Sequence, residues 1–225
     1  MNDELRVRKL NTYKVLDELD IPYDKDLNYP MKLESEVNKR DKEEIARRAI
    51  ASLMAIQVAC DILNESDLEQ SRKTFVGLTE KTYQVKNDLT KDEKEVLYGN
   101  PTNELAASTS WKYEAYWTLL WALELVPTLE YPSDICDCMH AIDIVRSQEN
   151  LKDFIMTSGL RSIKEILNEQ DINYRYYLLC EEARNNGEED PEYLDFRIIK
   201  ERHLAFKWLL GKNTEDDNWD LIKVE

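Results

Sequence analysis

Glycine is scarce in this chain of 225 residues, and its five copies are widely spaced. No two of them lie within ten residues of each other: they are Gly77, Gly99, Gly159, Gly187 and Gly211. A loop that cradles a phosphate with backbone amides needs clustered glycines, because only glycine lets the main chain approach the ligand closely. The sequence therefore excludes Walker A and dinucleotide-binding loops, and with them nucleotide binding of the common loop types.

Basic residues are in the minority, with 30 Lys and Arg against 46 Asp and Glu, which gives a net charge of -16. Such a surface repels phosphate backbones and anionic headgroups. The basic residues form no run longer than a pair such as Arg47-Arg48. We therefore expect neither nucleic acid nor a membrane among the partners.

Export and membrane signals are also missing. The segment Met1 to Arg6 lacks the charged-then-apolar layout of a signal peptide, and no apolar stretch approaches the roughly 18 residues of a membrane helix. The chain has four cysteines, and in a cytosolic domain of this size they are more often reduced core residues than a disulfide framework. These absences predict a cytoplasmic protein without disulfides.

Hydrophobic residues, at 42% of the chain, suffice for one sizeable core. They recur three to four positions apart, with little of the alternation that strands require, so we predict an all-α fold. We expect a single domain spanning residues 1–225, with about ten helices around a central tryptophan-rich one. The predicted helices lie near 3–19, 41–64, 66–74, 91–98, 103–126, 134–147, 150–157, 160–168, 171–186 and 195–210.

Two helix starts are well marked. Asp41 is followed by Glu44, and Thr90 by Glu93, the spacing in which a cap side chain and a third-position Glu satisfy each other's exposed amides. Helix ends are marked by residues that stop a helix: Pro127, Gly187 with Pro191, and Gly211.

The central helix carries an acid among indoles. Trp111, Trp117 and Trp121 lie on the same helical stripe as Glu114, and apolar groups occupy every side of the segment from 111 to 126. A helix of that kind is surrounded by others. Burial disfavours the charge of Glu114 unless a cation is supplied nearby.

Arg202 is the predicted cation, because its helical neighbours one and two turns away are apolar: Ile198, Ile199, Ala205, Phe206 and Leu209. A buried Arg cannot shed its proton and is nearly always paired. We therefore predict that Glu114 and Arg202 belong to one buried polar network, with His203 at its edge. Two interpretations stay open: the network fixes the register of packed helices, or it forms a catalytic or ligand site.

Other charged positions are weaker candidates. Asp171, Arg175 and Glu182 fall on one helical stripe beside several tyrosines, a spacing that favours a surface salt-bridge ladder over a ligand site. Arg48 lies among small residues that allow a second helix to approach closely, and we assign it no functional role.

The stretch from Cys136 to His140 is the one that suggests a metal, since thiolates and imidazole together suit zinc. On a helix, however, Cys136 and His140 would share a face while Cys138 points away. A fourth ligand at a recognised spacing is missing too. We predict no metal and no cofactor.

The order of several motifs resembles the bacterial domain-of-unknown-function family 4272 (DUF4272). The motifs, in chain order, are Glu43-Glu44-Ile45-Ala46-Arg47-Arg48-Ala49, Trp111-Lys112-Tyr113-Glu114-Ala115, Leu119-Leu120-Trp121-Ala122-Leu123, Tyr174-Arg175, Glu182-Ala183-Arg184, Glu201-Arg202-His203-Leu204-Ala205, Trp208-Leu209 and Trp219-Asp220. The resemblance runs from about Leu5 to Trp219 and implies an α-helical cytoplasmic bacterial protein of unassigned activity. Members usually read Trp-Arg at Trp111-Lys112, which puts in doubt any role there for a planar cation.

Three function classes remain. The leading one is a non-enzymatic interaction domain with a protein partner, including the special case of an acidic inhibitor of a cationic target. The second is an enzyme or small-ligand binder that uses Glu114, Arg202 and His203 in a pocket lined by Trp117 and Trp121. The third is a metal-dependent domain. The sequence gives no indication of an oligomeric state.

Overall fold

The computed structural model describes residues 2–23, 31–191 and 194–223, and within them every regular element is helical. This confirms the all-α prediction. The α-helices are α1 (Asp3–Glu18), α2 (Lys42–Leu63), α3 (Leu68–Gly77), α4 (Lys91–Tyr98), α5 (Asn103–Ser110), α6 (Tyr113–Ala122), α7 (Cys138–Arg146), α8 (Leu151–Thr157), α9 (Ile163–Asn185) and α10 (Phe196–Leu209).

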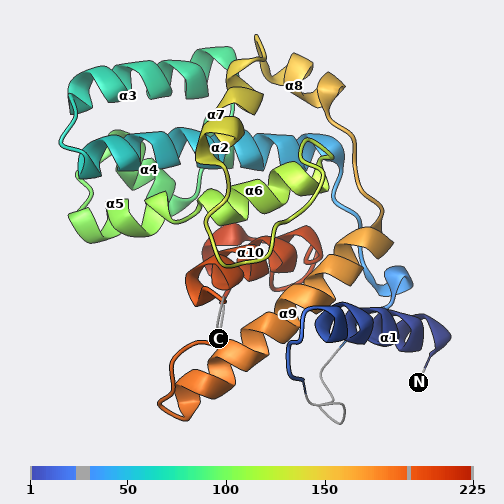
Figure 1. The fold of residues 1–225 in the computed structure, drawn as a ribbon. Coiled ribbons are helices and arrows are strands. Elements are labelled where there is room, and N and C mark those ends of the chain that lie inside the picture. The colour runs from blue at the N-terminus through green and yellow to red at the C-terminus, as the bar shows by residue number, and fades with distance from the viewer. Residues whose placement is uncertain (1, 24–30, 192–193, 224–225) are drawn as a thin grey trace.

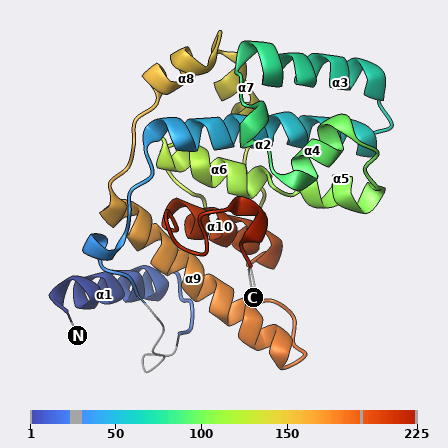
Figure 2. The same cartoon turned by 180° about the vertical axis from the view of Figure 1, so that it is seen from behind.

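The helices stack in layers (Figure 1). The long helix α2 packs against α3 on one side and against α4, α5 and α6 on the other, while α10 lies beyond α6. Helix α9 runs obliquely under α10, with α1 along its outer side, and the view from behind agrees (Figure 2). Because α10 contacts both α6 and α9, it joins two parts of the molecule: the layers around α2 and α6, and the pair formed by α1 and α9.

Two hydrophobic clusters correspond to these parts. The larger surrounds α2 and α6 and includes Leu53, Leu120 and Phe206. The smaller lies between α1, α9 and the start of α10 and includes Leu16 and Tyr177. In α6 every residue from Glu114 to Ala122 is buried, as predicted for a central helix.

Both predicted capping boxes are present. The Asp41 carboxylate accepts a hydrogen bond from the Glu44 amide at 2.8 Å, and Glu44 accepts from the Asp41 amide at 2.9 Å. Thr90 and Glu93 pair in the same way at the start of α4. These local sequences therefore define where α2 and α4 begin.

The prediction of one helix over 103–126 was wrong. The chain breaks between α5 and α6, and it leaves the helical conformation again at Glu124, whose φ is 57°. Ser108 and Ser110 donate to the carbonyls of Leu105 and Ala107, and such bonds compete with the helix ladder and favour its end. The break places Trp111 outside the central helix.

Two further boundaries differ. The predicted helices 160–168 and 171–186 are one helix, α9, because no Gly or Pro interrupts the polar run 168–170 and contacts with α1 and α10 support the helix. The helix predicted over 134–147 begins only at Cys138, where the Asp137 side chain accepts from the His140 amide. Residues 134–136 are therefore loop.

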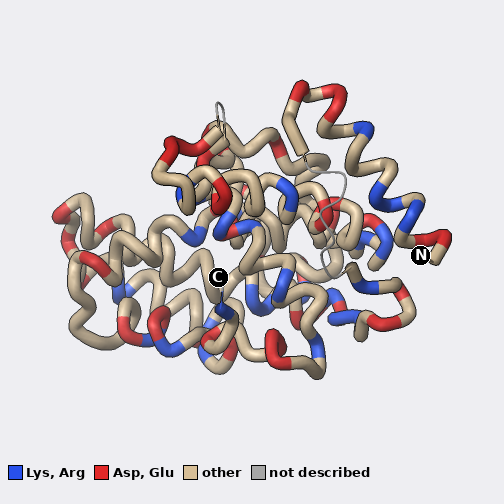
Figure 3. The backbone as a smooth tube through the Cα atoms, turned by 90° about the horizontal axis from the view of Figure 1, so that it is seen from below, with Lys and Arg blue, Asp and Glu red and all other residues tan. Residues whose placement is uncertain are grey.

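Lys and Arg positions are interspersed with Asp and Glu along the chain (Figure 3). Among the described residues, no helix combines the length and the apolar character that a membrane crossing requires.

Candidate functional site

The ion pair expected between Glu114 and Arg202 is present at the contact of α6 with α10. The Arg202 Nε donates to Glu114 Oε2 at 2.9 Å, and the side chains expose only 4% and 1% of their area. Arg202 Nη1 also donates to the Glu130 carbonyl at 2.6 Å, and the Cys136 amide donates to Glu114 Oε1. The pair thus ties α6 and α10 to the loop between α6 and α7.

The Glu114–Arg202 pair is closed to ligands in this arrangement. Neither side chain lines either of the two cavities described below, one beside Trp117 and one between α9 and α10. The Nη2 atom of Arg202 is buried and has no hydrogen-bond partner among the described residues, so its guanidinium is not fully satisfied. A sealed ion pair of this kind fixes the register of packed helices. The geometry therefore favours that interpretation of the network over a catalytic or ligand site.

A second carboxylate faces the Arg202 guanidinium. Burial raises the pKa of Glu169 on α9, and Arg202 acts in the opposite direction. Burial also raises the pKa of Glu201, which precedes Arg202, and one of its carboxylate oxygens has no partner among the described residues. The sequence reasoning missed both acids, because their burial comes from the packing of α9, α10 and the neighbouring loops.

His203 does not share the network of Glu114 and Arg202. Its ring packs against both Tyr174 and Tyr177, with centroid distances of 5.3 Å and 5.0 Å. Burial, followed by the nearby Lys207 ammonium, lowers the pKa of His203 to about 4. The imidazole is therefore uncharged at neutral pH, and it faces α9 rather than α6.

The two tryptophans that the sequence placed around one pocket are separated. Trp117 lines a cavity of about 470 Å³, with His140 edge-on to it at 6.0 Å. Trp121 is not part of that lining and packs against Phe206 at 6.0 Å and under the Arg161 guanidinium at 4.6 Å. A single pocket lined by both indoles is therefore not formed.

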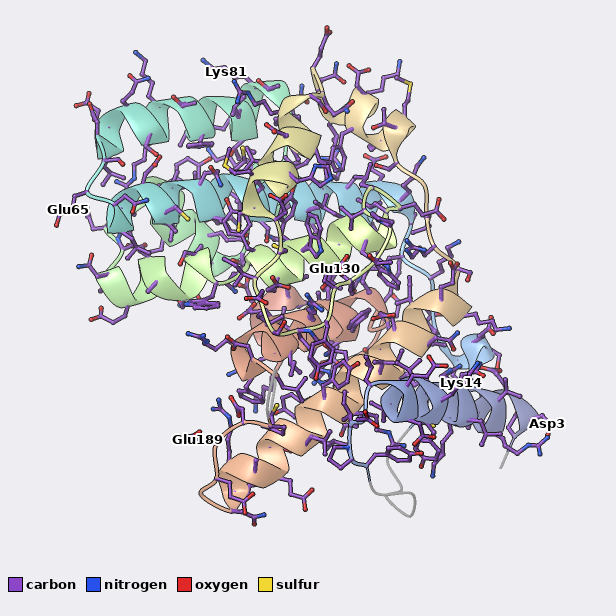
Figure 4. The ribbon with its side chains drawn as sticks, in the orientation of Figure 1. Asp3, Lys14, Glu65, Lys81, Glu130 and Glu189 are labelled. Atoms are coloured by element: carbon purple, nitrogen blue, oxygen red, sulfur yellow. The ribbon has the colours of Figure 1, made fainter. Side chains whose placement is uncertain are left out.

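The cavity beside Trp117 is an acidic groove. We define it by the described residues that line it: Trp117, Pro127, Thr128, Glu130, Tyr131, Ser133, Asp134, Ile135, Cys136, Asp137 and His140. No described lining residue is Lys or Arg. Glu130 lies on the loop from α6 to α7, which passes over α10 in this view (Figure 4).

The carboxylates of the acidic groove have only neutral partners in the described part of the chain. Glu130 accepts from the Thr128 hydroxyl at 2.8 Å, and Asp134 accepts from the Ser133 hydroxyl at 3.0 Å. Asp137 accepts the His140 amide at the start of α7. The sequence reasoning did not select these acids, although their alternation with apolar residues after Pro127 was a usable signal.

The interpretation of Arg175 as part of a surface ladder was wrong. Asp171 and Arg175 are 1% and 2% exposed, and only Glu182 lies on the surface. Helix α1 covers this face of α9: the Thr12 hydroxyl donates to Asp171 at 2.5 Å, and the Arg175 guanidinium lies 5.3 Å from the centroid of the Tyr13 ring. A spacing pattern on one helix cannot show that a segment 159 residues away in sequence covers it.

Arg48 belongs to a second buried ion pair that the sequence did not reveal. Its guanidinium donates to Glu93, to which the Ser52 hydroxyl also donates at 3.1 Å, and it lies over the Trp219 ring at 5.2 Å. Glu93 had been read only as the capping partner of Thr90. It performs both roles, since Oε2 accepts the Thr90 amide and Oε1 accepts Arg48.

The segment from Cys136 to His140 does not form the single helical turn that the sequence analysis assumed. Cys136 precedes α7, so it does not share a helical face with His140. Contact with the Cys138 thiol, together with burial, raises the pKa of Cys136, which favours the protonated thiol over a thiolate ligand. Among the described residues, no group of three or more His, Cys, Asp and Glu side chains is placed to hold a metal ion.

Comparison with protein families gives one match: a model described as "Domain of unknown function (DUF4272)" matches residues 8–222. No curated protein and no solved structure matches the chain. The matched region includes Glu114, Arg202, His203 and the whole acidic groove. It confirms the resemblance seen in the order of the sequence motifs. The chain belongs to the DUF4272 family.

Proposed function

We propose that this protein is a non-enzymatic binding domain of the bacterial cytoplasm, and that its acidic groove holds a basic segment of a protein partner. The observation that carries the proposal is the set of carboxylates of Glu130, Asp134 and Asp137, which have no cationic partner among the described residues. A partner's Lys or Arg would supply the missing charge.

Apolar surface beside these acids defines the rest of the partner. Ile135 lines the groove and is 57% exposed, and Met139, on the first turn of α7, is 66% exposed. Trp117 and Tyr131 contribute aromatic surface to the lining. Central apolar contacts surrounded by polar ones are the usual arrangement of a protein interface. The best-fitting segment therefore carries an apolar side chain next to Lys or Arg.

A non-enzymatic role is favoured by the separation of the groups that catalysis would need together. Glu114 and Arg202 are sealed by their neighbours, while His203 lies on the opposite side of α10 among the tyrosines of α9. The net charge of -16 favours a basic protein as partner over nucleic acid or an anionic membrane. The cytoplasmic and bacterial setting rests on the cysteine usage and on the family resemblance.

Selection of random displayed peptides on the purified protein tests the proposal. We expect the enriched peptides to combine Lys or Arg with an apolar side chain, and their affinity to fall as salt is raised. Fluorescence polarisation with one such labelled peptide then compares two variants of equal charge. Glu130→Gln/Asp134→Asn should weaken binding about tenfold or more, the equivalent of about 1.4 kcal/mol.

The matched control is Asp3→Asn/Glu65→Gln, which removes the same charge from two exposed sites far from Glu130 in Figure 4. This control should bind the peptide within about twofold of the unmodified protein, because screening weakens charges beyond about 10 Å. Enrichment of acidic or uncharged peptides, or equal weakening by both double variants, would contradict the proposal.

A further inference from the structure

A second cavity, of about 540 Å³, lies on the side of α10 that faces α9. Its walls come from segments that are far apart in the sequence: Lys32, the middle of α9, the second half of α10 and residues 215–223. It shares no lining residue with the acidic groove. Its chemistry also differs, because lysines line it, whereas no described lining residue of the acidic groove is Lys or Arg.

His203 forms one wall of this cavity and is 6% exposed. Its Nδ1 is buried and has no hydrogen-bond partner among the described residues. A buried polar atom without a partner is destabilising, so native structures seldom leave one without a reason. The lowered pKa keeps the ring neutral, so His203 adds no charge to the cavity wall.

The charges around the cavity leave a small positive excess. Among the described residues, Lys32, Lys207 and Lys223 line it together with Glu215 and Asp216, a balance of three positive and two negative groups. Lys207 lies 3.4 Å from the Asp216 carboxylate and donates to the Lys223 carbonyl at 2.7 Å. The ammonium groups of Lys32 and Lys223 have no carboxylate partner in the described part of the chain. One negative charge on a ligand would balance the site.

Apart from the amide of Gln170, the remaining lining is aliphatic or aromatic. Phe206 is fully buried, Leu210 is 5% exposed, and Leu221 is 65% exposed. The exposed Leu221 and the half-buried ring of Tyr174 therefore supply the apolar surface of the cavity, which favours a ligand with an apolar body. The rings of Tyr174 and His203 extend this surface along α9 and α10.

We propose that this cavity binds a small organic monocarboxylate, with its carboxylate toward Lys32 and Lys223 and its apolar body against Tyr174 and Leu221. A singly charged group matches the excess of one positive charge, whereas a phosphate with two charges would exceed it. A small inorganic ion would leave the apolar surface of Tyr174 and Leu221 uncovered. The site is independent of the acidic groove, so either proposal can fail without the other.

Nuclear magnetic resonance titration of the ¹⁵N-labelled full chain tests this site with three probes: hexanoate, 1-hexanol and inorganic phosphate. We expect hexanoate to shift amide signals of α9 and α10 near Tyr174 and His203 in a saturable way, without moving those around Trp117. Hexanol lacks the charge and phosphate lacks the apolar body, so each should bind at least about fivefold more weakly.

The variant Lys32→Gln/Lys223→Gln should weaken hexanoate binding about fivefold or more, and both side chains are exposed, so folding is preserved. The control Lys73→Gln/Lys152→Gln removes the same charge from exposed positions outside the cavity and should leave binding unchanged. The proposal is overturned if hexanoate causes no saturable shift at tens of millimolar. Equal binding of phosphate or hexanol, or equal loss in both lysine variants, overturns it as well.

Discussion

Arg202 and His203 are neighbours on α10, yet they belong to two different regions of the molecule. Arg202 faces α6, where its charge is matched by Glu114 and closed off from solvent. His203 faces α9, where it stays uncharged against two tyrosines and lines an open cavity. Successive helical residues point about 100° apart, so one helix packed between two others can present opposite environments. The α6 side has the chemistry of a structural joint, and the α9 side that of a binding site.

The largest expected effect comes from breaking the joint. In Glu114→Leu the Arg202 charge stays buried without its partner, and the Cys136 amide loses its acceptor. We expect the free energy of unfolding to fall by about 3–5 kcal/mol, which is the usual cost when one partner of a buried ion pair is removed and the other stays buried. Urea unfolding followed by circular dichroism measures the change.

The double variant Glu114→Leu/Arg202→Met is the control for that experiment. Removing both charges leaves no unpaired ion, so most of the lost stability should return. A loss below about 1 kcal/mol in the single variant, or a double variant no better than the single one, would mean that the pair is not the joint described here.

An intermediate effect is expected on the α9 side, and it depends on pH. The imidazole of the unfolded chain has a pKa of 6.5 and that of folded His203 about 4, so the unfolded state binds more protons between these values. Stability from this residue is fully present above about pH 6.5 and is lost as the pH falls toward about 4. The shift corresponds to about 3 kcal/mol.

The variant His203→Phe isolates this contribution, because it keeps an aromatic ring against Tyr174 and Tyr177 but cannot be protonated. Between pH 6.5 and 4, the unfolding free energy of the unmodified protein should fall more steeply than that of the variant. Parallel curves for the two proteins across this range would show that His203 is not held in its neutral form.

The smallest effect on stability is expected in the acidic groove. Substitutions there should cost far less stability than loss of the Glu114–Arg202 pair. Glu130 and Asp134 are exposed and bound only by hydroxyl groups of neighbouring residues. The variant Glu130→Gln/Asp134→Asn should therefore change the unfolding free energy by less than about 0.5 kcal/mol. Thermal unfolding by calorimetry measures it. A loss above about 2 kcal/mol would indicate that these carboxylates are structural rather than available to a partner.

Much of the fold can be predicted from the spacing of apolar residues within single helices. The Glu114–Arg202 pair shows that such spacing can also predict a contact between two helices. An acid on an all-apolar helix and an Arg on another apolar face each require a partner, so burial cost alone was enough to predict their contact. The same reasoning failed for Arg175, because its helix looked amphipathic by spacing while α1 covers it in the fold. It also missed Glu93, whose capping role concealed its pairing with Arg48.

The sequence by itself determined the helical class, the capped starts of α2 and α4, the burial of α6 and the need of Glu114 for a cation. Only the tertiary structure decided that α10 separates Arg202 from His203, that α1 buries Asp171, and that the loop after α6 brings Glu130 and Asp134 to one groove. The physical reason is that hydrophobic period and capping act within one helix, whereas cavities and covered faces depend on how separate helices pack.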